Sequence, residues 1–128
     1  MRKSYRVKSE KAFGRVFNEG ENKANRQFVI YTLKKDQPHF RVGISVGKRI
    51  GNAVTRNRVK RLIRQAVFEL KPYLKPEMDF IVIARKPAAM MSQLEVKKSL
   101  IHVLNLAHVL TETPSAIIKS DSRSEHRE

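Results

Sequence analysis

Three patterns in the 128-residue chain predict a single α+β domain with the element order α-β-β-α-β-α. Residues 26–34 and 40–46 are rich in β-branched and aromatic residues that alternate between two faces, which is typical of strands. Residues 54–70 repeat apolar residues at helical spacing, and residues 78–84 form an apolar run that suits a central, buried strand. The length suits one domain with one core.

The first helix is expected over residues 9–19, with Ser9 as its N-cap and Gly20 at its end. Phe13 and Phe17 are four residues apart, so their side chains lie one turn apart on the same edge of this helix. Together with Tyr31, this pair suits two roles equally well. The rings either pack in the core or form an exposed platform on which unpaired bases stack.

The strand over residues 26–34 is expected to place alternate side chains on opposite faces. One face carries Phe28, Ile30 and Thr32, and the other carries Val29, Tyr31 and Leu33. A turn at residues 34–39 leads to the strand over residues 40–46, and this short connection predicts an antiparallel hairpin.

The second helix is expected over residues 54–70, and prolines follow it. Its core-facing stripe consists of Val59, Leu62, Ile63, Ala66, Val67 and Leu70. A last helix begins at a capping box made by Ser92 and Glu95, and its apolar pattern continues to Leu110. Residues 1–111 are therefore expected to form the domain, and residues 112–128 a flexible tail.

The charge of the chain is strongly positive and unevenly placed. Twenty-seven Lys and Arg residues against twelve Asp and Glu give a net charge of +15, and residues 37–68 contain no acidic residue. A merely solvated helix face usually mixes both signs, so this block predicts an anionic partner rather than simple solubility. Arginine predominates there, which favours the phosphates of a nucleic acid.

The sequence offers little for a self-sufficient active site. Cysteine is absent, and His102 and His108 are six residues apart, so they do not share a helix face. The only neighbouring carboxylates are Glu19 with Glu21 and Glu77 with Asp79, for which surface positions are expected. We therefore predict no catalytic and no metal-binding residue, and no small-molecule substrate.

The N-terminus is basic but lacks the apolar run of a signal peptide, and no stretch is long and apolar enough to cross a bilayer. We therefore expect a cytoplasmic protein without a membrane partner.

Residues 51–65, GNAVTRNRVKRLIRQ, resemble the signature of the bacterial ribonuclease P protein component, with its Arg-Asn-Arg core. Phe13 and Phe17, residues 25–31, residues 41–46 and residues 83–85 look like other blocks of that family. The resemblance covers residues 2–110, and Gly47 departs from it because relatives often carry Ser there.

The resemblance implies an α-β-β-β-α-β-α sandwich like the ribosomal protein S5 domain 2-like fold, with a left-handed β-α-β crossover. It also implies that the protein joins a catalytic RNA that removes the 5′ leader of precursor tRNA. The magnesium ions would be held mainly by the RNA, and the protein itself would not be catalytic.

The family's roles also transfer to particular residues. The resemblance assigns contacts with the catalytic RNA to Lys48, Arg49, Arg56, Asn57, Arg58, Lys60, Arg61 and Arg64. It assigns contacts with the single-stranded leader to Phe13, Phe17, Val29, Tyr31 and Ser45.

Two other classes of function remain open from the residues alone. A ribosomal protein, or a general binder of structured RNA or DNA, would also need a basic helix. A stand-alone endonuclease would need carboxylates that converge on metal ions, and the scattered acidic residues argue against one.

Overall fold

The computed structural model describes residues 3–126, with side chains for residues 4–120. The strands are β1 (Glu21–Ala24), β2 (Phe28–Lys34), β3 (Arg41–Ser45) and β4 (Met78–Ala84). The α-helices are α1 (Glu10–Glu19), α2 (Ala53–Leu70), α3 (Gln93–Leu106) and α4 (Pro114–His126). Short 3₁₀ turns are η1 (Lys3–Tyr5), η2 (Lys48–Ile50), η3 (Lys71–Tyr73) and η4 (Lys86–Met90). The α-β-β-β-α-β-α order of the resemblance is thus confirmed, and one more helix follows it.

The four strands form one mixed sheet in the order β1-β2-β4-β3. β2 pairs antiparallel with β1 and with β4, whereas β3 pairs parallel with β4. The predicted hairpin between β2 and β3 is therefore wrong, because β4 lies between them. β4 is the strand that is apolar on both faces, so the central position buries it best.

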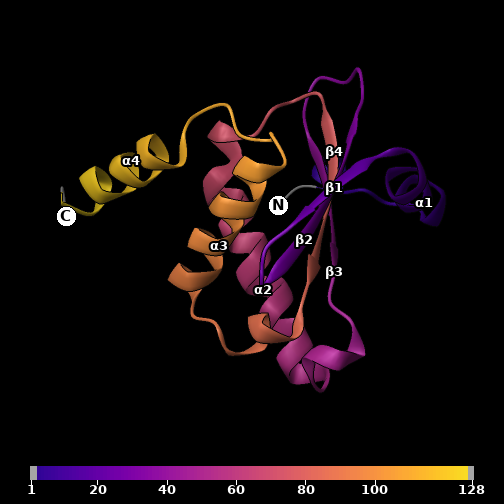
Figure 1. Cartoon of the computed structure of the whole chain (residues 1–128), viewed down its shortest axis with the longest axis horizontal. Helices are drawn as coiled ribbons and strands as arrows, with labels where there is room; N and C mark the ends of the chain where they lie inside the picture. The colour runs from indigo at the N-terminus through magenta and orange to yellow at the C-terminus, as the bar shows by residue number, and fades with distance from the viewer. Residues whose placement is uncertain (1–2, 127–128) are drawn as a thin grey trace.

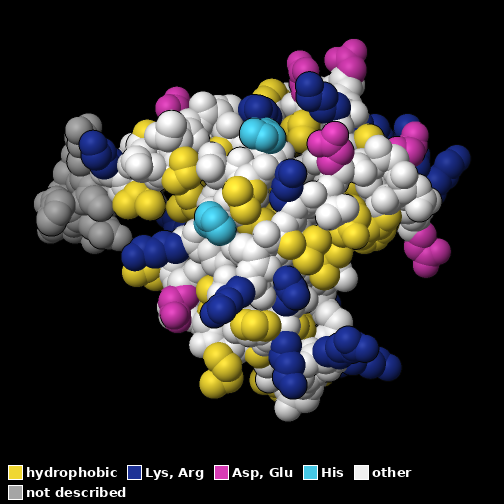
Figure 2. Space-filling view, in the orientation of Figure 1, with side chains coloured by type: hydrophobic (Ala, Val, Ile, Leu, Met, Phe, Trp, Pro, Cys, Tyr) yellow, Lys and Arg dark blue, Asp and Glu magenta, His cyan; other side chains and the backbone are white. Residues whose placement is uncertain are grey.

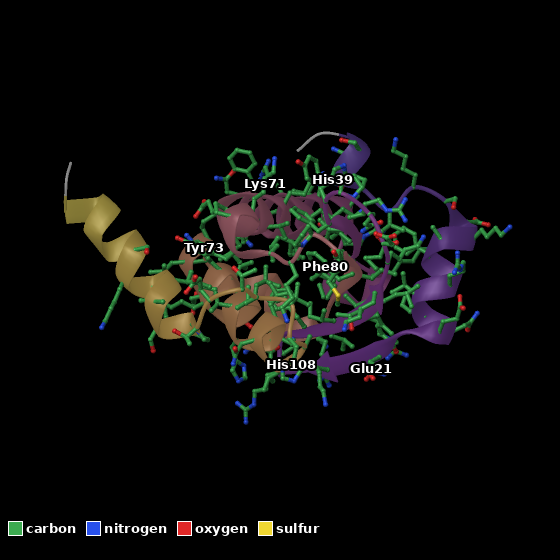
Figure 3. All side chains as sticks on the ribbon, turned by 90° about the horizontal axis from the view of Figure 1, so that it is seen from above. Glu21, His39, Lys71, Tyr73, Phe80 and His108 are labelled. Atoms are coloured by element: carbon green, nitrogen blue, oxygen red, sulfur yellow. The ribbon has the colours of Figure 1, made fainter. Side chains whose placement is uncertain are left out.

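The sheet separates two layers of helices (Figure 1). α2 and α3 cover one face, and α1 lies against the other, an arrangement that also shows in the view from above (Figure 3). Phe28 and Ile30 of β2 and Phe80 and Val82 of β4 are fully buried and belong to the main core. Ile63 of α2 packs into the same core.

β1 is the strand that the residue pattern alone does not predict. All four of its residues are exposed, so it has no apolar alternation that would mark it as a strand. The turn into β2 is held by Asn25, whose Oδ1 accepts hydrogen bonds from the backbone N–H groups of Gln27 and Phe28. The amide of Asn25 also donates to Ser99 on α3.

Both predicted caps are confirmed. The Ser9 hydroxyl accepts a hydrogen bond from Ala12 N at 3.0 Å, and Ser92 and Glu95 form the capping box of α3. α3 nevertheless ends at Leu106, four residues earlier than expected. His108 has a φ of 59°, and Val109 then pairs with the segment after η3 through a hydrogen bond from Lys75 N. Val109 and Leu110, which continue the apolar pattern, are buried after this chain reversal.

Part of the expected flexible tail, residues 112–128, is helical. Pro114–His126 form α4, and the Thr113 hydroxyl accepts a hydrogen bond from Ala116 N at its start. Ile117 is fully buried, so one apolar side chain is enough to anchor the first turn. Residues 127–128 of the predicted tail lie outside the described residues.

The expected surface position of Asp79 is also wrong. Its side chain is 1% exposed and accepts two hydrogen bonds from Arg41, at 2.9 and 2.7 Å, and one from Gln37 at 2.9 Å. Burial raises the pKa of this carboxyl, but the hydrogen bonds from Arg41 and Gln37 and the charges of Arg41 and Lys35 outweigh it, so the pKa is lowered. Arg41 of the acid-free block therefore has an internal partner.

Between residues 3 and 126, no helix is both long and apolar enough to cross a membrane.

Candidate nucleic-acid interface

The aromatic residues of α1 meet Tyr31 on the face of the sheet opposite the main core. The rings of Phe17 and Tyr31 are 4.8 Å apart in an edge-to-face arrangement, and those of Phe13 and Phe17 are 6.4 Å apart. Val16, not either phenylalanine, is the fully buried residue of α1, and Phe17 is 38% exposed. The rings therefore pack against one another and still reach the surface.

The register of the sheet brings the other predicted leader contacts to the same face. Val29 and Ser45 both lie beside Ile83, one on each side of it, and Tyr31 lies beside Ile81 in the next row. All of these alternate with the core-facing residues of their strands. The five residues Phe13, Phe17, Val29, Tyr31 and Ser45 thus form one partly exposed area, here called the aromatic surface. Figure 2 shows hydrophobic side chains gathered between the sheet and α1.

Gly43 of β3 supports the aromatic surface at a position that the sequence analysis did not assign to it. A Cβ atom at Gly43 would lie 2.5 Å from Cζ of Phe13, which shows that the phenyl ring rests directly on the strand backbone. A glycine inside an otherwise apolar strand is the signal that could have indicated such a close approach.

The basic residues predicted to contact RNA lie on and before α2. Asn52 caps this helix by accepting a hydrogen bond from Thr55 N, and Gly51 before it has a φ of 153°. The side of α2 that faces the core buries Val59 and Ile63, so the polar side of the helix faces solvent, as expected. Lys48, Arg49, Asn57, Arg61 and Arg64 are exposed, and Arg56, Arg58 and Lys60 are half-buried. We call these eight residues the basic face.

Arg58 differs from the other residues of the basic face because its guanidinium already has partners. Nη2 donates to the Met91 carbonyl at 2.9 Å, and Nη1 donates to the Ala89 carbonyl at 3.3 Å. Arg58 therefore fastens the segment of η4 to α2. Arg56, in contrast, has an unpaired atom: its Nε is buried and has no hydrogen-bond partner among the described residues.

The histidines and neighbouring carboxylates do not converge. His39 lies by Lys71, and His108 by Glu21 on the opposite side of the molecule (Figure 3). His102 is exposed near Asn25. Glu19, Glu21 and Glu77 are exposed as predicted, unlike Asp79. No group of three or more His, Asp or Glu residues in the described part of the chain could hold a metal ion.

The sequence and the fold both match known proteins. A family model described as Ribonuclease P matches residues 1–108. The chain is 66% identical over 113 residues to the ribonuclease P protein component of Ligilactobacillus salivarius, a match that covers 88% of this chain and 100% of the relative. It is 62% identical over 111 residues to that of Enterococcus faecalis, covering 86% and 94%.

Solved structures agree with these matches. The ribonuclease P protein of Staphylococcus aureus superposes with a TM-score of 0.79 at 46% identity, covering 85% of this chain and all of the other. The protein from Thermotoga maritima superposes with a TM-score of 0.73 at 28% identity, covering 77% and 96%. The chain therefore belongs to the bacterial ribonuclease P protein family.

Proposed function

We propose that this ribonuclease P protein works through two separate surfaces, one for each RNA that it meets. Family membership supports a role as the protein subunit of ribonuclease P, which forms the 5′ end of tRNA. The observation that carries the division of labour is the placement of the aromatic surface and the basic face on opposite sides of the sheet. One protein domain can then hold a substrate and a large RNA together.

The basic face would contact the catalytic RNA. Exposed Lys and Arg side chains bind phosphates without reading sequence, and arginine can bind them through two parallel hydrogen bonds. The charge here is not neutralised internally, because α2 has no acidic residue before Glu69. These contacts would position a folded RNA against α2.

The aromatic surface would hold the single-stranded 5′ leader of precursor tRNA. Aromatic rings stack on every base, so they suit leaders of varied sequence. The partly exposed rings of Phe17 and Tyr31 support this role, as does the position of Val29 and Ser45 beside them.

The hydrolytic chemistry and its magnesium ions would belong mainly to the RNA. Magnesium prefers oxygen ligands, and the charged side chains of the basic face are Lys and Arg, so this surface does not fit a protein-held magnesium site. The protein would contribute positive charge and substrate contacts. We place the reaction in the cytoplasm, since its substrate is a tRNA transcript.

Cleavage of a leader-bearing precursor tRNA at low magnesium tests this function. The reaction is run with a bacterial catalytic RNA alone, with this protein alone and with both. We expect efficient cleavage only with both components. RNA binding without stimulation would instead indicate a general RNA-binding protein, and cleavage by the protein alone would place an active site in the chain.

A further inference from the structure

A small pocket opens at the edge of the sheet, where β3 is the outermost strand. The N-terminal segment pairs with β3 at a single point, a bridge between Arg6 and Val42, with a hydrogen bond of 3.0 Å from Val7 N to the Val42 carbonyl. Beside this bridge lies a pocket of about 150 Å³. Its lining consists of Arg6, Val7, Phe13, Val42, Gly43, Ile44 and Arg64.

The pocket joins the two surfaces described above. Phe13 comes from α1 and belongs to the aromatic surface, whereas Arg64 comes from α2 and belongs to the basic face. Because α1 and α2 cover opposite faces of the sheet, an RNA contact that continues from one surface to the other would pass around the β3 edge (Figure 1). The pocket is on that path.

Two arginines, Arg6 and Arg64, are among the residues that line the pocket. Arg6 and Arg64 are exposed, and the side chain of neither forms a hydrogen bond or an ion pair with any residue that the structure describes. Some arginines do have internal partners: Arg41 is paired with Asp79, and Arg58 donates to two backbone carbonyls. Two positive charges at one small pocket repel each other. An anion bound there attracts both and offsets this electrostatic repulsion.

We infer that Arg6 and Arg64 form a binding site for one RNA phosphodiester group at the β3 edge. The volume corresponds to about five waters at ~30 Å³ each, so a phosphate group can enter. Guanidinium forks suit phosphate oxygens, and the ring of Phe13 forms an apolar wall. The inference rests on the proposed function and adds Arg6, which the sequence analysis did not assign. The phosphate comes either from the precursor leader or from the catalytic RNA.

The test compares Arg6→Gln, Arg64→Gln and the double variant in two assays. One assay measures affinity of the assembled holoenzyme for leader-bearing precursor, with mature tRNA as reference. The other measures affinity of the protein for the catalytic RNA. Lys98→Gln, which removes one exposed charge from α3, is the matched control. Arg6→Lys keeps the charge but loses the planar fork.

Each single substitution is expected to weaken one of the two affinities by about tenfold, because it removes a charge-assisted hydrogen bond. The double variant should be no more than about threefold weaker than either single variant, since both arginines hold the same phosphate. Arg6→Lys should recover part of the loss. The dependence of log affinity on log salt should fall by about 0.7 in the affected assay.

A loss for the precursor alone would assign the phosphate to the leader, and a loss for the catalytic RNA alone would assign it to that RNA. The inference is overturned if both affinities match those of Lys98→Gln, or if the effects of the two arginines simply multiply. Failure of the proposed function is a separate result, because the unmodified protein would then fail to stimulate cleavage of precursor tRNA by the catalytic RNA.

Discussion

Gly43 shows how a single missing side chain can shape a binding surface. Replacing it with alanine would place a Cβ 2.5 Å from Cζ of Phe13 and 3.3 Å from Cγ1 of Ile81, so the phenyl ring must move. We expect Gly43→Ala to cost about 1–3 kcal/mol of unfolding free energy and to weaken precursor binding. Urea unfolding and precursor titration measure the two effects.

Gly47→Ala is the matched control, because nothing lies within 4 Å of a Cβ at that position. If both glycine variants unfold and bind alike, Phe13 does not depend on the bare backbone of β3.

Asp79 gives the protein a predictable dependence on acid. Its pKa is lower in the folded protein than in the unfolded chain, so the stability it contributes is present above its ordinary pKa of 3.8 and is lost as the pH falls through the folded value. Asp79→Asn should cost about 3 kcal/mol near pH 7, since it leaves Arg41 without its partner. The difference from the unmodified protein should shrink below about pH 4.

Urea unfolding across pH 2.5–7 checks this, with the exposed Asp36→Asn as control. A constant difference across the range would contradict the assignment of the acid-sensitive stability to Asp79.

At the scale of elements, the Arg-Asn-Arg motif divides its tasks. The guanidinium of Arg58 donates hydrogen bonds to the carbonyls of Ala89 and Met91. Replacing Arg58 should therefore affect the η4 segment before it affects RNA binding. Arg58→Ala should destabilise the protein by about 1–3 kcal/mol and speed hydrogen exchange of the Ala88 and Met91 amides. Arg61→Ala, on the exposed side of the same helix, should leave that exchange unchanged. Equal protection in both variants would show that Arg58 does not hold the segment.

Helices were easier to predict than the strand order, for physical reasons. Caps such as Ser9 and Ser92 and the apolar stripe of α2 are local signals, and each matches its helix. The pairing of β3 with β4 is a choice among distant segments, decided by which strand is best buried on both faces. β1 escaped detection because its exposed residues carry no alternation. The hydrogen bonds of Arg58 are made to a segment about 30 residues further along the chain. Local residue spacing in the sequence could not predict them.

The candidate site followed the same division. The side of α2 that carries the basic face could be derived from helical periodicity alone, and the grouping of Val29 with Tyr31 from strand alternation. The position of Ser45 beside them required the parallel pairing of β3 with β4, and the role of Gly43 required the packing of α1. The pocket at Arg6 required the N-terminal bridge to β3.

At the scale of the whole molecule, the central claim is that one small domain separates substrate contact from contact with the catalytic RNA. The sheet separates the two: α1, which carries Phe13 and Phe17 of the aromatic surface, lies on one side and α2 on the other (Figure 1). Away from the pocket at the β3 edge, where Phe13 and Arg64 meet, substitutions on one side should therefore affect one RNA and not the other. Phe17 and Arg61 are suited to the comparison because both are exposed.

The most direct measurement is a crossed titration of Phe17→Ala and Arg61→Ala against precursor tRNA and catalytic RNA, with Phe68→Ala as the control for loss of an exposed ring. Phe17→Ala should weaken precursor binding about tenfold, since stacking contributes about 1–3 kcal/mol per base, and leave catalytic-RNA binding unchanged. Arg61→Ala should weaken binding of the catalytic RNA and spare the precursor affinity of the assembled enzyme. Equal losses of both affinities in both variants would contradict the two-surface account.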